Sequence, residues 1–242
     1  MVAPLKILHY KRLESTNTTA YRLAEKSAPD WTVVAADVQT KGRGRGQNKW
    51  KSPKGGLWFS IILRPKLSGQ TLPLLQFLTA VATRTAVENE TGLGVKLKWP
   101  NDLVIGKAKL GGILIESKTL GAQVSFAILG VGLNINQSKA RLPPGATSLQ
   151  LVSGKQQNIR LLLRAVLHQI KSSFDLLDEP SKLMEEWWRN CVHRPMRVRI
   201  TDSSRAVTGI SIGIDENGAL LIETDDHRIQ RVSEGSLGIL DD

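Results

Sequence analysis

The sequence predicts an α/β (α+β) fold, in which a large domain of strands and helices precedes a small all-β module. Up to about residue 190, segments with helical spacing of apolar residues alternate with short apolar runs rich in β-branched residues. After residue 195 only short strand-like runs with turn signals such as Asp-Glu-Asn-Gly remain. A module of about 50 residues buries little apolar surface alone, so we expect it to pack on the first domain, with the boundary between residues 1–192 and 193–242.

The N-terminal half predicts helix and strand in alternation. Ser15 can cap a helix over residues 15–26, because its hydroxyl can accept from a free backbone N–H. Residues 31–39 and 56–65 predict strands, the second stopped by a proline. Apolar residues at helical spacing predict a helix over residues 73–92.

After residue 92 the sequence predicts four short strands, then two helices, and then the strands of the C-terminal module. The four strands are residues 95–99, 102–105, 109–117 and 123–135, with Gly106 and Lys107 in a hairpin turn, and residues 141–149 form a loop. Residues 159–177 predict one long amphipathic helix, and residues 185–190 end another. The module contributes strands 196–200, 206–215, 218–224 and 227–233.

The charge distribution indicates an anionic partner. The net charge is +11, and residues 38–66 carry eight basic side chains and no acidic one. Nucleotide phosphates, an acidic protein and nucleic acid all fit this pattern. A single cysteine excludes an internal disulfide and fits a reducing compartment. The start lacks an apolar segment of signal-peptide length, and no run reaches the ~18 apolar residues of a membrane span, so we expect a cytoplasmic protein with no membrane partner.

A glycine-rich basic loop is the first candidate for chemistry. From Lys41 to Gly56 there are five glycines, six lysines or arginines and no acid. Glycine lets a backbone N–H approach a phosphate closely, and arginine adds a planar fork for phosphate or carboxylate oxygens. The same composition also fits a solvated basic turn. Trp50 beyond the loop can stack on an adenine or serve as a buried structural residue.

Two further motifs can form the walls of a pocket. In Lys-Trp-Pro-Asn-Asp-Leu, Asp102 can bind Mg²⁺ and Asn101 a nucleotide, although an Asx-type turn between strands fits equally. Lys109 can neutralise a carboxylate and a phosphate that meet, or it can extend to solvent from a strand edge. Gly111 and Gly112 would let a flat ligand lie on the backbone.

Other common sites find no support in the sequence. The four histidines are scattered without metal-ligand spacing, and Cys191 has no neighbouring cysteine at redox-motif spacing. Neither a nucleophile-elbow motif nor a P-loop motif is present.

Taken together, the motifs resemble the biotin–protein ligases, also called biotin–[acetyl-CoA-carboxylase] ligases, over almost the whole chain. They occur in the same order, and they comprise E-S-T-N at 14–17, Gln39, G-R-G-R-G-Q-N-K-W at 42–50, the strand segment at 52–65, K-W-P-N-D-L at 98–103, K-L-G-G-I-L-I-E at 109–116 and G-V-G-L-N-I-N at 130–136. The resemblance implies a mixed-sheet catalytic domain over residues 1–192 and an SH3-like β-barrel domain over 193–242. It implies that ATP activates biotin to biotinyl-5′-AMP and that a carrier-protein lysine then takes the biotinyl group.

The resemblance also implies the site residues. Those near biotin would be Ser15, Thr16, Asn17, Gln39, Arg43, Gly44, Arg45, Lys109, Gly111 and Gly112. Those near ATP would be Trp50, Asn101, Lys109 and Asn134, with Asp102 at Mg²⁺. Lys109, Arg43 and Arg45 would be catalytic, through positioning and charge rather than covalent attack.

The sequence departs from the family in two places. Gly46 stands where some members carry a third loop arginine, which we expect to change loop mobility and not activity. The N-terminal DNA-binding domain of the repressor members has no counterpart here, so we expect a short ligase without a repressor role.

The implied partner is the biotin carboxyl carrier protein of acetyl-CoA carboxylase, and both a monomer and a homodimer remain open. A lipoate/octanoate–protein ligase is the nearest alternative. A nucleic-acid-binding protein is a distant one, because the basic residues surround a glycine loop rather than a recognition helix or an aromatic-studded sheet.

Overall fold

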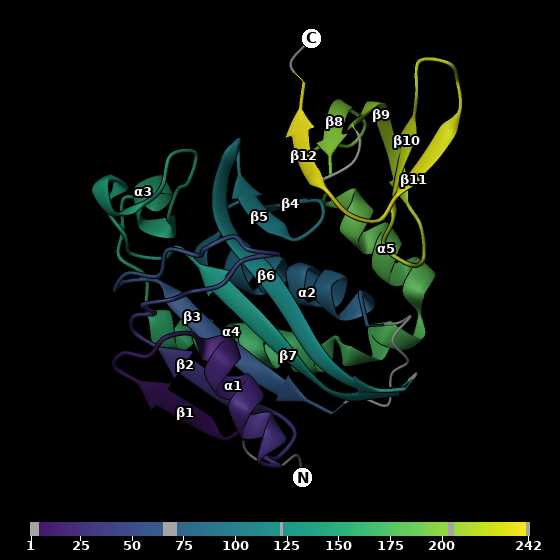
Figure 1. Cartoon of the computed structure of the whole chain (residues 1–242). Coiled ribbons are helices and arrows are strands. Elements are labelled where there is room, and N and C mark those ends of the chain that lie inside the picture. The colour runs from purple at the N-terminus through teal and green to yellow at the C-terminus, as the bar shows by residue number, and fades with distance from the viewer. Residues whose placement is uncertain (1–4, 65–71, 122, 203–205, 241–242) are drawn as a thin grey trace.

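The structure, a computed structural model, describes residues 5–64, 72–121, 123–202 and 206–240. Within these residues seven strands form one sheet and five form another (Figure 1). The strands of the large sheet are β1 (Ile7–Tyr10), β2 (Thr32–Ala36), β3 (Leu57–Leu63), β4 (Lys96–Lys98), β5 (Asp102–Ile105), β6 (Ala108–Leu120) and β7 (Gln123–Leu133). The helices are α1 (Thr16–Glu25), α2 (Leu74–Thr91), α3 (Leu149–Ser153), α4 (Ile159–Ser172) and α5 (Pro180–Arg189), with 3₁₀ turns η1 (Lys139–Arg141) and η2 (Phe174–Asp178). The small sheet contains β8 (Arg197–Thr201), β9 (Ala206–Ile214), β10 (Leu220–Glu223), β11 (Ile229–Val232) and β12 (Ser236–Ile239).

The large sheet is mixed and has the strand order β1-β2-β3-β7-β6-β5-β4. β1 pairs parallel with β2, and the other neighbours pair antiparallel. Every residue of β3 is buried, as expected for a central strand with both faces covered. The mixed-sheet α/β fold predicted from the sequence is therefore confirmed.

Helices cover both faces of this sheet (Figure 1). On one face α1 packs Ala20 and Ala24 against Val34, Ile62 and Phe126. On the other face α2 packs against the sheet and α4 packs against α2, so most of α2 is buried, including the polar Thr79 and Thr83. Within the described ranges, none of the helices is long and apolar enough to span a membrane.

Several element boundaries differ from the prediction. The helix expected over 159–177 ends at Ser172, because Ser173 caps it and η2 continues with tighter turns that place Phe174 edge-on to Trp31 at 5.3 Å. The strand expected to reach residue 135 ends at Leu133. β1, α3 and β12 were not predicted, and Pro65, the expected strand stop, lies outside the described residues. The hairpin turn at Gly106 is confirmed, with φ of +57°.

The small sheet has the order β11-β10-β9-β8-β12 and lies beside α5, at the opposite end of the molecule from β1 (Figure 1). Its buried side chains belong to the same apolar core as α2. The Trp99 indole N–H of the larger domain donates to the Gly218 carbonyl of the module at 3.1 Å. The module therefore packs on the larger domain, as expected.

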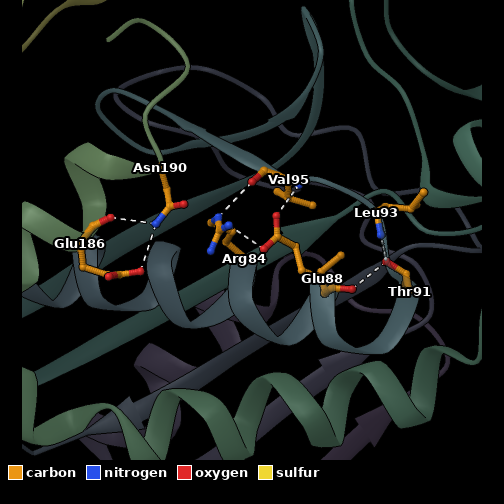
Figure 2. A network of polar contacts seen from close by, with 8 residues as sticks. Arg84, Glu88, Thr91, Leu93, Val95, Glu186 and Asn190 are labelled. Carbon is orange, nitrogen blue, oxygen red and sulfur yellow. Dashed lines mark hydrogen bonds and ion pairs between the residues drawn. The ribbon is translucent and has the colours of Figure 1, made fainter.

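A polar network holds the connection from α2 into β4 (Figure 2). Arg84 donates to the Val95 carbonyl at 3.0 Å, and Glu88 accepts from the Val95 N–H at 2.9 Å. Arg84 and Glu88 also pair with each other at 2.6 Å. Nearby in Figure 2, Asn190 at the end of α5 donates to Glu186. Because β4 leads directly into the Lys-Trp-Pro-Asn-Asp-Leu turn, this network fixes where that turn begins.

His193 anchors the same turn from the side of the small sheet. Its Nε2 accepts the backbone N–H of Trp99 at 3.2 Å, and its side chain is fully buried. Burial lowers the pKa of His193 to about 4. The imidazole therefore stays neutral in the folded protein, which an acceptor at Nε2 requires.

We predict that His193 makes the folded protein sensitive to acid. An unfolded histidine has a pKa of about 6.5, so the unfolded chain takes up a proton that the folded chain does not. The contribution of the neutral His193 to the free energy of unfolding is complete above pH 6.5. It is lost as the pH falls towards 4, by on the order of 3 kcal/mol. The free energy of unfolding in urea should be measured at pH 7.5 and at pH 5. Its decrease between the two pH values should be smaller for His193→Gln, which keeps an acceptor, than for the unsubstituted protein. Equal differences would contradict the prediction.

Candidate active site

A cavity of about 450 Å³ opens between α1, the glycine-rich loop, the Trp99–Asp102 turn and the glycines of β6 and β7. Gly235, which precedes β12, and Ser236 and Leu237 of β12 close one side of it. The volume is in the range of small-molecule sites, and the lining mixes polar and apolar groups. Almost all residues proposed from the sequence meet here.

The end of the cavity beneath α1 is built from uncharged hydrogen-bonding groups. The Ser15 hydroxyl caps α1 by accepting from the Thr18 N–H. Gln39 Oε1 accepts from the Thr16 backbone N–H at 2.7 Å and from its hydroxyl at 3.1 Å. Gln39 Nε2 then donates to Ser52 at 2.7 Å. These bonds fix the direction of each amide and hydroxyl before any ligand binds.

Asn17 is held from two sides. Its Oδ1 accepts from Ser60 at 2.6 Å, and its Nδ2 donates to Glu116 at 2.8 Å. Ser60 is fully buried, and Asn17 is 5% exposed. A buried amide with both ends occupied has one orientation, so Asn17 presents a defined donor and acceptor pattern to the cavity.

Backbone glycines form the floor of the cavity. Gly112 of β6 pairs with Gly132 of β7, and Gly130 faces Asn17. Trp50 lies on this floor, because a Cβ at Gly132 would be 2.7 Å from its Nε1 and one at Gly112 would be 3.5 Å from its Cζ3. The indole also meets Trp58 edge to face at 6.4 Å. The Trp50 side chain is partly buried, and its Nε1, which faces Gly132, is itself buried and has no protein acceptor among the described residues.

Lys109 occupies the opposite end. Its Nζ is 2.6 Å from Asp102 Oδ1 and 5.2 Å from the centre of the Trp50 ring. The 143–147 loop holds its backbone, since Lys109 N–H donates to the Gly145 carbonyl at 2.8 Å and its own carbonyl accepts from Thr147 at 2.9 Å. The Lys109 side chain therefore lines the cavity and remains 39% exposed.

Asn101 and Asn134 lie near this end and also support the backbone. Asn101 Nδ2 donates to the Ile113 carbonyl at 2.8 Å, which ties the turn to β6. Asn134 is 4% exposed, and its backbone bonds to Leu110 and Leu149. The Asn101 side chain thus bonds across to β6 rather than within an Asx-type turn, and it also lines the cavity.

The glycine-rich loop folds over the cavity as a short hairpin. Gly44 N–H donates to the Asn48 carbonyl at 2.8 Å. Arg43 pairs with Glu116 at 2.8 Å, and Arg45 donates to the Gly235 carbonyl at 2.5 Å. Burial is the main cause that lowers the pKa of Arg45, and the nearby acids Asp102 and Glu234 oppose it. The loop is thereby attached both to β6 and to the small sheet.

The cavity is strongly positive. Six basic side chains line it, and Asp102 is the single acidic residue among the described lining residues: the basic ones are Arg43, Arg45, Lys49, Lys51, Lys98 and Lys109. Over the described ranges, no group of three histidine, cysteine or acidic side chains could hold a metal ion. Asp102 is the acidic lining residue that could offer an oxygen ligand to a cation bound together with a phosphate.

The structure places Gly111, which the sequence analysis put near biotin, outside the lining of the cavity. It does not line the cavity, because successive residues of a strand point to opposite faces, and a Cβ at Gly111 would meet Leu133 and the Gly132 carbonyl. Lys98, Lys49 and Lys51 were not proposed, although they lie within or beside the motifs. Ser236 and Leu237 were missed because only the packing of the two sheets brings them to the site.

Family models match two parts of the chain. Residues 9–134 match the biotin/lipoate A/B protein ligase family, and residues 197–236 match the biotin protein ligase C-terminal domain. This chain belongs to the biotin protein ligase family. The first match covers the loop, the turn and the glycine strands of the cavity, and the second covers most of the small sheet.

Individual ligases are similar over nearly the whole chain. The bifunctional ligase/repressor BirA of Bacillus subtilis is 35% identical over 91% of this chain and 70% of its own length. The biotin–[acetyl-CoA-carboxylase] ligase of Paracoccus denitrificans is 28% identical over 87% of this chain and 91% of its own. The Aquifex aeolicus biotin protein ligase, solved with biotin and ATP, has a TM-score of 0.83 at 28% identity and covers 98% of this chain and 99% of its own.

We predict that Gly132→Ala displaces Trp50. The new Cβ would lie 2.7 Å from Nε1, so the indole must move, and overpacking of this kind costs about 1–3 kcal/mol. The indole N–H resonance of Trp50, assigned with Trp50→Phe, should shift strongly. Gly112→Ala is the matched control, because its nearest contacts lie at 3.5 Å. A resonance that Gly132→Ala leaves in place would contradict the role of the glycine floor.

Proposed function

We propose that this protein activates biotin with ATP to biotinyl-5′-AMP and then transfers the biotinyl group to a lysine of a biotin carboxyl carrier protein. One observation carries the proposal: a single cavity joins an uncharged, pre-oriented hydrogen-bonding end to a strongly cationic end. A ligand with a neutral polar ring, an acid tail and a nucleotide phosphate fits this polarity. The family membership and the relatives solved with biotin and ATP support the assignment.

The end beneath α1 would bind the ureido ring of biotin. Thr16, Asn17 and Gln39 offer fixed donors and acceptors there, with Ser15 at the helix start. A ligand that lacks matching groups would leave these polar atoms unpaired, so acids other than biotin would bind with lower affinity. Gly112, whose nearest contacts lie at 3.5 Å, would let the ligand approach the backbone of β6.

In the first step a biotin carboxylate oxygen would attack the α-phosphorus of ATP, and pyrophosphate would leave. Lys109 would neutralise the carboxylate and the phosphate as they meet, and Arg43 and Arg45 would stabilise the charge from the loop. Trp50, Asn101 and Asn134 would contact the nucleotide. Mg²⁺ would supply further neutralisation of the phosphates, with Asp102 as its protein ligand.

In the second step the lysine amine of the carrier would attack the acyl carbon of the adenylate, and AMP would leave. No protein side chain forms a covalent bond in either step, so the protein acts by orientation and charge. The loop, with Gly44 at its hairpin, would exclude water from the mixed anhydride between the steps. Residues 1–192 would form the catalytic domain and residues 193–242 the SH3-like domain. An acetyl-CoA carboxylase subunit in the cytoplasm is the proposed carrier.

We predict that the protein exchanges pyrophosphate into ATP when biotin is present. Exchange requires reversible adenylate formation from the acid bound in the cavity. Biotin, lipoate and octanoate should be assayed in parallel with purified protein. Exchange with biotin alone would support the proposal. Exchange with lipoate or octanoate instead would retain the mechanism and overturn the acid, and exchange with none would overturn the function.

Lys109→Ala tests the charge at the reacting end in the same assay. The exchange rate should fall at least ~100-fold, as for loss of a charge-stabilising group at a transition state, while the protein stays folded. Lys118→Ala is the matched control on the same strand, because Lys118 pairs with Glu25 outside the cavity. Normal exchange by Lys109→Ala would contradict the assignment.

We predict that Arg45→Gly releases the adenylate. The substitution removes the bond to Gly235 that attaches the loop to the small sheet, so the cavity should open more often. Biotin labelling of a bystander protein should rise, about tenfold for a contact worth ~1.4 kcal/mol. Lys54→Gly removes a charge from the same basic segment without touching the cavity and should not have this effect. Equal labelling by both variants would refute the role of the attachment.

A further inference from the structure

Glu116 lies behind the cavity yet contacts two of the side chains that face into it. It follows Gly112 and Leu114 on the same face of β6, but it is not a lining residue. One carboxylate oxygen accepts from Asn17 at 2.8 Å, and the other pairs with Arg43 at 2.8 Å. A single carboxylate thus joins the start of α1 to the glycine-rich loop.

The first contact determines the orientation of the Asn17 amide. A carboxylate can only accept hydrogen bonds, so Nδ2 must face Glu116. Ser60 holds the other end by donating to Oδ1 at 2.6 Å. An amide carries two N–H donors and two lone pairs, so one of each remains for the cavity. Without Glu116 the donor side of the amide would lose its fixed partner.

The second contact restrains Arg43. The arginine side chain is 49% exposed, whereas that of Glu116 is 20% exposed, so the pair attaches a partly solvated side chain to the sheet. A long side chain loses rotational freedom when it is ordered, and a partner that orders it in advance reduces this loss on ligand binding. The Glu25–Lys118 pair at 2.9 Å also joins α1 to β6, but no lining residue takes part in it.

We propose that Glu116 is a positioning residue for adenylation, which sets the Asn17 amide and the Arg43 guanidinium in the geometry that binds the acid. The inference rests on the proposed function. Glu116 touches neither acid nor nucleotide and acts through these two side chains. Its two oxygens have separable effects. One contacts Asn17, at the end of the cavity that would bind the ureido ring, and the other contacts Arg43 of the loop.

Two substitutions separate these effects. Glu116→Gln keeps an oxygen that can accept from Asn17 but loses the charge that pairs with Arg43. Glu116→Ala loses both contacts. In biotin-dependent pyrophosphate exchange we expect the KM for biotin to rise about fivefold for Glu116→Gln and about thirtyfold for Glu116→Ala, since the Arg43 pair is half exposed and the Asn17 contact is buried. Glu25→Gln, with the same loss of charge on the same face, should leave KM unchanged.

A double-mutant cycle distinguishes positioning from a general effect on the fold. In an Arg43→Met background, Glu116→Gln should change the KM by less than about twofold, because its partner is already absent. Glu116→Ala should still raise the KM in that background through Asn17. Thermal unfolding of each variant checks that the fold is retained.

The outcomes separate the two proposals. If the unsubstituted protein exchanges pyrophosphate with biotin while both Glu116 variants match it, the inference about Glu116 is overturned and the proposed function stands. The same holds if the effects of Glu116→Gln and Arg43→Met are additive. If the unsubstituted protein shows no exchange with any acid, the proposed function fails, and the role of Glu116 in it fails as well.

Discussion

The site depends on the pairing of glycines across β6 and β7. Gly112 lies opposite Gly132, and the backbone there forms a flat floor in the middle of a twisted sheet. Any Cβ at Gly130 or Gly132 would collide with Asn17 or Trp50. Three segments that are distant in sequence can therefore approach the sheet at one point: the start of α1, the end of the basic loop and the Trp99–Asp102 turn. The cavity is the space left between them.

The walls above this floor divide into two chemical environments. Beneath α1 the groups are uncharged, mostly buried and bonded to one another, from Ser52 through Gln39, which is partly exposed, and Thr16 to Ser60 and Asn17. At the other end the groups are cationic and partly solvated, which lowers the desolvation cost of gathering like charges. Lys109 and Asp102 offset part of that charge in the ligand-free protein. This polarity suits a ligand that is neutral at one end and anionic at the other.

Much of the fold could be predicted from local patterns, and much of the site from motifs. β3 is apolar apart from Ser60, and apolar residues recur along α2 up to Val87, so the burial of both elements follows largely from sequence. The edge strand β1 is short and mostly exposed, which leaves little pattern to detect. Gly111 and Gly112 follow each other on one strand and face opposite sides, and only the structure shows that Gly112 is the one that lines the cavity. Ser236 and Leu237 reach the cavity through domain packing, which no local pattern encodes. Glu116 ends a recognised motif, but its contacts join segments 73 and 99 residues away, so only the structure reveals them.

A crystal structure with biotin and a non-hydrolysable ATP analogue tests the central claim most directly. The account predicts the ureido ring within hydrogen-bond distance of Thr16, Asn17 or Gln39, the carboxylate beside Lys109, and the nucleotide against Gly112, Gly132 and Trp50. Glu116 should still contact Asn17 and Arg43 in that complex. A ureido ring at the Lys109 end, or a nucleotide bound outside the cavity, would contradict the account.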